Sequence, residues 1–255
     1  MHWLQPIAMR GWRWLRERSK IAPMKRAIMF FAIAATTLAV TACASNGPRE
    51  YPGVQLKPAA NPSAVVAAEL AFARLAQIKG QWTAFSETAT ADAEMFVPLR
   101  VNAQGWLKGK ADPAVAVKWQ PHEVWSSCDG SYAITRGAWQ GPKAVGYFIT
   151  IWQRQKDGRY KWVLDQGDIL KEAGPVPDMI EAKVADCSPV TSAVAIASGR
   201  LDGSSVDEKT VSSPDGSLEW TSVVLADGAR NFSVRMWLDG EMRDVLISEV
   251  AAPAP

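Results

Sequence analysis

The sequence predicts an α+β fold in which helices are followed by two antiparallel β meanders. In the stretch Gln120–Asp168, three turn signals separate four runs that are rich in aromatic and β-branched residues. Two of these turns are Asp-Gly pairs, at Asp129 and Asp157, and this pair is the strongest short-range signal for a β hairpin. Apolar residues recur at helical spacing before this stretch. After residue 190, Asp-Gly pairs recur every 12 or 13 residues, which indicates a second meander.

The first predicted helix begins at Asn61 and Pro62. Asn is a favoured N-cap residue, and Pro fits the first turn of a helix. Apolar side chains follow at helical spacing, and Gly80 ends the pattern. A second short helix is expected over Gln81–Thr88, and a short strand over residues 94–98.

The region between this strand and the first meander is predicted to hold a loop and a third helix. The loop covers Ala103–Lys110 and carries Trp106, and the helix covers Pro113–Lys118 with Asp112 as its cap. After the meander, Lys171–Pro189 is a Pro-rich connector. Residues 190–255 form the second meander, which is small for an independent domain, so we expect it to pack on the first.

The element order from Asn61 to Leu170, with the segments FARLAQIKGQWTAFSETATADAEMFVP and GRYKWVLDQGD in place, resembles the nuclear transport factor 2-like (SnoaL-like) superfamily. The resemblance implies a cone-shaped domain over residues 61–170, in which a curved antiparallel sheet wraps the N-terminal helices and leaves a pocket at its open end. It also implies that Asp92 lies in a loop where related sequences often place a pocket acid. Because it rests on element order rather than on a motif, it specifies the fold better than the function.

Residues 1–42 have the layout of a signal peptide. A basic segment starts at Met24, an apolar run follows, and small residues lead to Cys43. This layout resembles a bacterial lipoprotein signal, and the residues before Met24 are either an overcalled start or a long basic region. The apolar run of about 14 residues is short for a membrane-spanning helix, and an uncleaved anchor is the alternative. We expect lipidation at Cys43, a flexible tether over residues 43–60, and a periplasm-facing location in the bacterial cell envelope, at the outer membrane.

The charge balance argues against nucleic acid as a partner. Residues 1–42 hold seven of the 28 Lys and Arg residues and one of the 26 acidic residues, so the rest of the chain is net acidic. Binding of nucleic-acid phosphates depends on clustered Lys and Arg side chains. Contact with the membrane is expected through the lipid anchor only.

The cysteine and histidine content limits the chemistry further. With Cys43 lipidated, Cys128 and Cys187 remain as a pair in an oxidising compartment, and the sequence favours a disulfide over two separate apolar side chains. No His lies near either cysteine in sequence, so neither is expected to be a nucleophile. His122 is the only His after residue 42, which excludes a multi-histidine metal site. No nucleotide-binding motif is found, and no cofactor is expected.

The hairpins of the first meander predict which residues stand side by side. Two-residue turns at Asp129 and Asp157 and a three-residue loop at 141–143 place four residues in one row: His122, Gly137, Tyr147 and Asp168. Gln166 falls in the next row. The concave, helix-packed face is expected to carry Val124, Ala133, Trp139, Val145, Tyr147, Ile149, Ile151, Trp162 and Leu164. The convex face is expected to carry Glu123, Trp125, Tyr132, Ile134, Arg136, Phe148, Trp152 and Asp165.

The row at the end of the concave face is the candidate site. His122, Tyr147 and Asp168 are the candidate catalytic residues, and the candidate ligand contacts are Trp106, Trp139, Tyr147 and Gln166. His122 and Asp168 would stand roughly 14 Å apart across three strand spacings, so they could flank a ligand but not form a dyad. The alternative is that Tyr147 bonds within the core while the other two lie on a wetted rim.

We expect a lipid-anchored envelope protein that binds a small apolar ligand without catalysis, or that acts as a scaffold. One alternative is a lyase, isomerase or hydratase that acts on a small hydrophobic substrate in the cone pocket. The other is an interaction module that binds another envelope protein through the convex sheet face. A convex face so rich in aromatic residues needs a cover, and the second meander or a homodimer could supply it.

Overall fold

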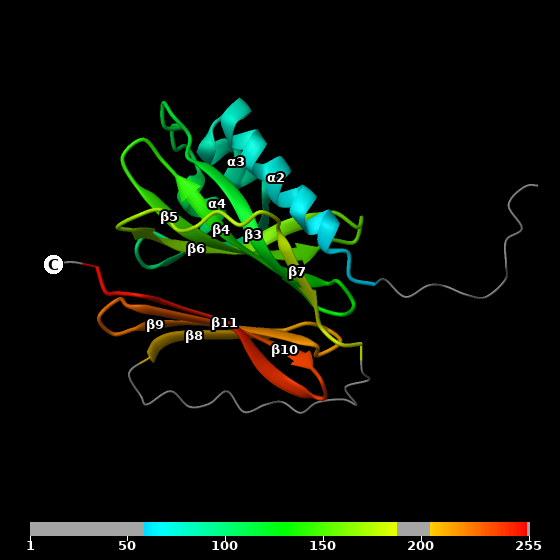
Figure 1. Cartoon of the computed structure of the whole chain (residues 1–255). Coiled ribbons are helices and arrows are strands. Elements are labelled where there is room, and N and C mark those ends of the chain that lie inside the picture. Colours follow the sequence, from blue (N-terminus) through cyan, green and yellow to red (C-terminus); the bar gives the residue numbers. More distant parts are fainter. Residues whose placement is uncertain (1–58, 188–204, 254–255) are drawn as a thin grey trace, which may run out of the picture. The chain divides into compact units, whose positions relative to one another are not determined.

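Two antiparallel-rich sheets and three helices make up the described part of the chain, which in this computed structural model is residues 59–187 and 205–253 (Figure 1). In their order across the first sheet, the strands are β2 (Arg100–Asn102), β1 (Ala89–Phe96), β6 (Tyr160–Leu170), β5 (Val145–Arg154), β4 (Tyr132–Gln140), β3 (Lys118–Ser126) and β7 (Glu181–Val184). The second sheet has the order β11 (Glu241–Val250), β10 (Arg230–Leu238), β9 (Leu218–Leu225) and β8 (Ser205–Ser212). The helices are α2 (Pro62–Lys79), α3 (Gln81–Thr88) and α4 (Ala103–Leu107). The predicted α+β class with a large curved sheet is confirmed.

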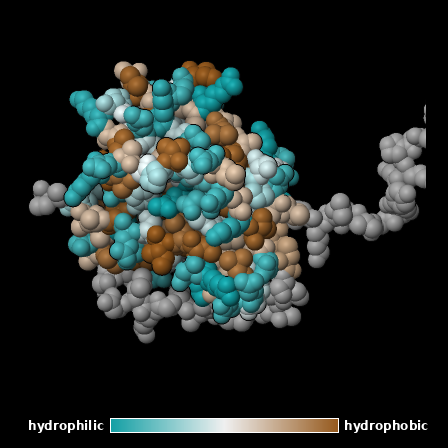
Figure 2. Space-filling model, viewed as in Figure 1, coloured by the Kyte–Doolittle hydropathy of each residue, from teal (hydrophilic) through white to brown (hydrophobic). Residues whose placement is uncertain are grey.

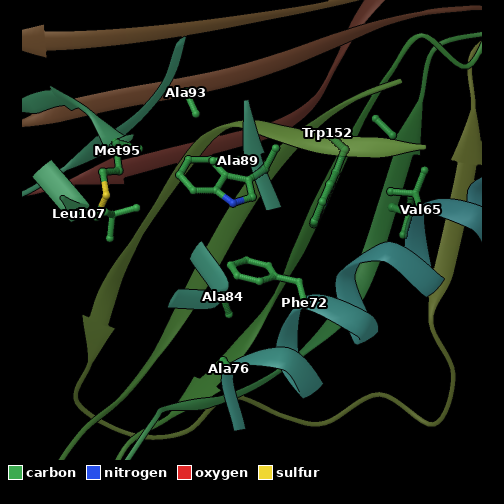
Figure 3. Close-up of a cluster of buried hydrophobic side chains, with 13 residues drawn as sticks. Val65, Phe72, Ala76, Ala84, Ala89, Ala93, Met95, Leu107 and Trp152 are labelled. Carbon is green, nitrogen blue, oxygen red and sulfur yellow. The ribbon is translucent and has the colours of Figure 1, made fainter. Parts of the chain in front are cut away.

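The first two helices form where the sequence predicts them. The side chain of Asn61 accepts a hydrogen bond from the Ala64 backbone N–H and so caps α2. Gly80, with φ of 109°, ends α2 and leads directly into α3. Phe72 points from α2 toward the sheet, on the same side as Trp152 (Figure 3), and both side chains are fully buried. The helices therefore cover one face of the seven-stranded sheet, which we call the helix-covered face.

The predicted third helix at Pro113–Lys118 is wrong, because Asp112 caps another helix. Its carboxylate accepts hydrogen bonds from the backbone N–H groups of Trp82 and Thr83 and from the Thr83 hydroxyl. These are the first-turn donors of α3, whose own N-cap residue, Gly80, has no side chain to satisfy them. The expectation of a loop at Ala103–Lys110 is also wrong, because its first half forms α4.

Replacing Asp112 by Ala is therefore expected to destabilise the start of α3 rather than the segment that follows Asp112. Two backbone donors and one hydroxyl would lose their acceptor, and the thermal unfolding midpoint should fall. Asp112→Asn, which keeps an acceptor oxygen, should restore part of the loss, and Asp178→Ala in the exposed connector should change nothing. Thermal unfolding of the three variants measures this, and an Asp112→Ala variant as stable as the wild type would contradict it.

The β4–β5 loop is one residue longer than predicted, and this changes the faces of the sheet. Gln140 pairs with Val145, so the loop holds four residues, and Thr135 pairs with Thr150 rather than with Ile149. Because side chains alternate along a strand, this shift reverses the faces of β5 and of the paired part of β6. Phe148 and Trp152 consequently lie on the helix-covered face, where the sequence predicted Ile149 and Ile151.

Two β bulges, one in β6 and one in β3, also shift the pairing between neighbouring strands. Ile151 pairs with Leu164 but Trp152 pairs with Trp162, so Val163 is an extra residue that returns Trp162 to the helix-covered face. Tyr147 still pairs with Asp168, as predicted. A second bulge in β3 leaves His122 as the extra residue between the pairs that Pro121 and Glu123 form with β4.

The face opposite the helices is covered by the four-stranded sheet. The shared core is formed by Trp125, Ile134, Ile149, Ile151 and Leu164 from the first sheet and by Leu218, Trp220, Phe232, Val234 and Met236 from the second. The second meander thus supplies the cover that this face needs. This face, through which a protein partner or a homodimer was expected to bind, is packed against strands of the same chain.

The connector contributes a strand and a covalent link. Within the predicted Pro-rich connector, residues 181–184 form β7, which pairs in parallel with β3. Cys128 and Cys187 form a disulfide across 59 residues of sequence, which in the chain-entropy description stabilises the fold by about 4 kcal/mol. The link ties the β3–β4 turn to the end of the connector.

Hydrophobic side chains that remain at the surface lie in separate groups among hydrophilic ones on the face drawn in Figure 2. Within the described ranges, none of the helices has the length and apolar character needed to cross a membrane. The predicted signal peptide, the lipidation site Cys43 and most of the tether lie outside the described residues.

Candidate functional site

A cavity of about 380 Å³ lies between the helices and the helix-covered face of the sheet. Eight aromatic residues of these layers line it: Phe72, Trp82, Phe85, Phe96, Trp119, Trp139, Tyr147 and Phe148. Several of their rings pack edge to face, with centroid distances of 4.8 Å between Phe72 and Trp119 and 5.7 Å between Trp82 and Phe85. Such packing fixes the rings against one another, so the cavity has rigid apolar walls.

Asp165 provides a titratable group on the cavity wall. It lies on β6 and is partly exposed toward the cavity, and its carboxylate accepts a hydrogen bond of 2.8 Å from the Thr150 hydroxyl on β5. Burial raises the pKa of Asp165 to about 7, although the Thr150 hydrogen bond acts in the opposite direction. Near neutral pH this carboxyl can therefore both accept and donate a proton.

A second buried carboxyl, Glu69, lies behind the cavity wall on α2. It is fully buried, and its two oxygens accept hydrogen bonds from Trp119 Nε1 at 2.7 Å, Thr135 Oγ1 at 2.6 Å and Trp152 Nε1 at 3.0 Å. Burial raises the pKa of Glu69, and the three hydrogen bonds partly offset this. Glu69 thus fixes the positions of two indoles, one of which lines the cavity.

The two carboxyls influence each other. The negative charge of Glu69 contributes to the raised pKa of Asp165. Thr135 connects the two groups through the sheet, because its hydroxyl contacts Glu69 and also lies 3.4 Å from the Thr150 backbone oxygen. Two negative charges repel each other strongly in a poorly solvated site, so ionisation of one carboxyl disfavours ionisation of the other. The pair is therefore expected to titrate in a coupled manner.

Gly146 on β5 leaves space for the indole ring of Trp139, which forms one wall of the cavity. It pairs with Trp139, and a Cβ atom at this position would collide with the Trp139 indole ring. The indole instead lies over the glycine and donates a hydrogen bond of 3.1 Å to the Tyr147 backbone oxygen. This contact holds Trp139 against the sheet and keeps the cavity open beside it.

The structure places three of the four predicted ligand contacts, Trp139, Tyr147 and Gln166, among the residues that line the cavity. Trp106 on α4 packs edge to face against Trp82 at 5.3 Å, so it supports a lining residue from behind. Of the predicted polar row, Tyr147 and Asp168 line this cavity, and His122 does not. Tyr147 and Asp168 border it along the β5–β6 edge, but their side chains lie toward the second sheet.

Three contacts establish the position of the Tyr147 and Asp168 side chains. The Tyr147 hydroxyl lies 2.9 Å from Ser248 Oγ on β11, and its ring is 5.9 Å from the Arg136 guanidinium. Both Tyr147 and Asp168 are close enough to Arg230 on β10 to raise its pKa against the effect of burial. The Tyr147 and Asp168 side chains point to the second sheet because the β4–β5 loop has four residues, which reverses the two faces of β5.

His122 lies away from the aromatic cavity, whereas Gln166 borders it. Gln166 pairs with Ile149 and so faces the second sheet, and its Nε2 has no hydrogen-bond partner among the described residues. His122 lines a separate hollow of about 330 Å³, next to Arg136 and Tyr147, and burial lowers its pKa. His122 and Tyr147 thus share a hollow, but it is on the opposite face from the helices.

Asp92 and Asp165 lie in different places from those that the sequence predicted. Asp92, which the family resemblance implied as a pocket acid, lies on an exposed position of β1. Asp165, which was predicted on the convex face, lines the cavity, as does Asp168. One sequence signal for the site was available, since Glu69 interrupts the apolar stripe of α2 between Val65 and Phe72 and must find buried partners.

The fold and the cavity together define an α+β protein whose curved sheet and covering helices enclose a ligand-sized aromatic cavity. Pockets of this volume that combine apolar walls with few polar groups suit small molecules. Within the described ranges, no cluster of His, Cys, Asp and Glu has an arrangement that could hold a metal ion.

Solved structures similar to this chain are nuclear transport factor 2-like proteins. A protein of Parabacteroides distasonis that is provisionally named a ketosteroid isomerase has 16% identity and a TM-score of 0.35, over 45% of this chain and 97% of its own. A nuclear transport factor 2-like protein of unknown function from Silicibacter pomeroyi has 15% identity and a TM-score of 0.33, over 43% and 99%. Another from Burkholderia xenovorans has 15% identity and a TM-score of 0.31, over 44% and 88%.

No family model matches the chain, and no curated protein matches it. At these identities the similar structures say nothing about the chemistry of the cavity. The function has to be inferred from the residues that line it.

Proposed function

We propose that this protein binds a small, largely apolar ligand in the aromatic cavity, with one polar group of the ligand directed at Asp165. The observation that supports this most directly is the cavity itself, with eight aromatic residues around a single site where Thr150 and Asp165 supply hydrogen-bonding groups. Apolar area gives such a ligand most of its binding energy, and the polar group fixes its orientation. The fold holds both parts on regular elements rather than on loops.

Filling the cavity tests this proposal. Val117 lines the cavity, whereas Val115 lies two residues away and is exposed. Val117→Trp is expected to weaken binding of a small aromatic probe such as 2-phenylethanol at least tenfold, and Val115→Trp to leave it unchanged. Tryptophan fluorescence or calorimetric titration reads out the binding. Equal affinities of the two variants would place the bound probe outside the cavity and contradict the proposal.

A second candidate function is proton transfer on the bound ligand, and the pKa of Asp165 favours it. A carboxyl with a pKa of about 7 is matched to taking a proton from carbon next to a carbonyl and returning it elsewhere. In deuterium oxide the wild type would then exchange the acidic C–H protons of a bicyclic ketone such as 2-tetralone faster than buffer does. Proton NMR follows this exchange. A rate unchanged by Asp165→Asn would exclude Asp165 as the base.

We further propose that the protein is anchored by lipid on Cys43 and faces the periplasm. The proposal rests on the basic, apolar and small-residue segments that precede this cysteine. A Cys43→Ser variant should lose incorporation of labelled palmitate and move from the membrane fraction to the soluble fraction. Labelling that persists in this variant would contradict the proposal.

A further inference from the structure

We propose that the cavity selects organic cations, in the form of an ammonium group carried on a small aromatic or alicyclic frame. This inference deepens the proposed function and rests on it. Three features support it: the sign of the charges at the cavity, the absence of a cation beside Asp165 in the described structure, and the aromatic walls.

The charge of the lining residues is uniformly negative. Asp165 and Asp168 line the cavity, and the described lining residues include no Lys, Arg or His. Glu69 adds a third carboxyl behind the wall on α2. A ligand that brings a negative charge would face these groups in a poorly solvated site, where repulsion is strong. Anionic ligands are therefore disfavoured.

The nearby cations are already matched with other groups. Arg230 lies on the second-sheet side beside Asp168, 4.6 Å from the Phe96 ring centroid, and donates to the Gly167 backbone oxygen. Arg100 forms ion pairs with Glu94 and Asp207 at the edge of the sheet. Neither guanidinium contacts Asp165 in the described structure.

The surroundings of Asp165 leave its charge without compensation. Thr150 on β5 supplies its one side-chain hydrogen bond. Met95 pairs with it from β1, and Glu69 approaches from α2 with the same sign of charge. Among the described residues, a positive charge at this point can come only from a ligand. An ammonium group beside Asp165 would offset the cost of burying its charge.

The aromatic walls favour the same ligand class. The faces of Trp, Phe and Tyr rings attract cations, and aromatic cages are a recurring site for ammonium groups. Trp82, Trp119 and Trp139 provide indoles, which are the best of these rings for the purpose. An ammonium group on a hydrophobic frame can therefore meet Asp165 with its charge while its frame contacts the rings.

Three probes of matched size and different charge test the inference on the full chain: 2-phenylethylamine, 2-phenylethanol and 3-phenylpropionate. Calorimetric titration at pH 8 is expected to show the amine binding at least tenfold more tightly than the alcohol, with the propionate weakest. At pH 5 the amine is still protonated but Asp165 is largely neutral, so the preference for the amine over the alcohol should fall.

Variants identify the residue responsible. Asp165→Asn is expected to reduce the amine-to-alcohol preference to less than threefold, while retained binding of the alcohol shows that the cavity has formed. Asp92→Asn, on the exposed side of β1, is the matched control and should keep the full preference.

The outcomes separate the two proposals. Binding of the alcohol as tight as that of the amine would overturn the cation inference and leave the ligand cavity in place. A preference for the amine that survives Asp165→Asn would also overturn it, because the charge would act elsewhere. If none of the three probes binds, both the inference and the proposed function fail.

Discussion

Raising the pH from 5 to 8 is expected to lower the free energy of unfolding of the wild-type protein by about 2–3 kcal/mol through Asp165 alone. The pKa of Asp165 is raised from 3.8 to about 7 in the folded protein. The folded state therefore holds the proton more tightly than the unfolded state does. The resulting stabilisation is fully present below pH 4 or so and is lost as the pH rises through 7.

The comparison that isolates this effect is Asp165→Asn at both pH values. The variant has no carboxyl at this position, so its stability should fall by less than that of the wild type over the same interval. At pH 8 it should be the more stable of the two proteins. Urea unfolding at pH 5 and 8 measures both proteins, and Asp92→Asn should behave as the wild type. Parallel pH profiles for the wild type and Asp165→Asn would show that Asp165 is well solvated.

Replacing Glu69 by Leu is expected to lower the free energy of unfolding by about 3–5 kcal/mol. The carboxyl is the acceptor for two indole N–H groups and contacts the Thr135 hydroxyl, all within the core. Leu removes both acceptor oxygens, so Trp119 Nε1 would lose its partner and Trp152 Nε1 would keep only Thr135 Oγ1. Trp119 would also lose the contact that holds it against the cavity.

The conservative replacement separates the hydrogen bonds from the charge. Glu69→Gln keeps one carbonyl oxygen and should recover more than half of the loss caused by Leu. Glu87→Gln on α3, where the carboxylate forms an exposed ion pair with Lys79, is the control and should change stability by less than about 0.5 kcal/mol. Urea unfolding of the three variants gives the values. A Leu variant as stable as the Gln variant would mean that the Glu69 hydrogen bonds add nothing.

Local signals in the sequence were sufficient for the first two helices and for the four strands of the first meander. Asn61, Pro62 and Gly80 mark helix ends by their own backbone preferences, and Asp-Gly pairs mark turns in the same way. The role of Asp112 could not be predicted from its neighbours in sequence, because it caps a helix through Trp82, which lies 30 residues earlier. The strand β7 depends on pairing with β3, a contact between distant residues.

The predicted register at the candidate site differs from the observed one by a single residue of loop length. A three-residue β4–β5 loop would have turned the Tyr147 side chain to the helix-covered face, whereas the four-residue loop places Phe148 there and leaves the Tyr147 side chain facing the second sheet. On β6 the same shift turns the side chain of Asp165, rather than that of Asp168, toward the helix-covered face, and both residues line the cavity. The aromatic and acidic composition of the site could be predicted from the sequence, but its register could not, because turn length is not encoded in side-chain alternation.

The most direct test of the Asp165 site is the pKa of that carboxyl in the free protein. The ¹³Cγ chemical shift of Asp165, assigned by comparison with Asp165→Asn, can be followed from pH 4 to pH 9. An Asp enclosed by the aromatic cavity and coupled to Glu69 should titrate with a midpoint near 7. A midpoint near 4, as for an Asp in water, would contradict both the enclosed cavity and the functions proposed for it.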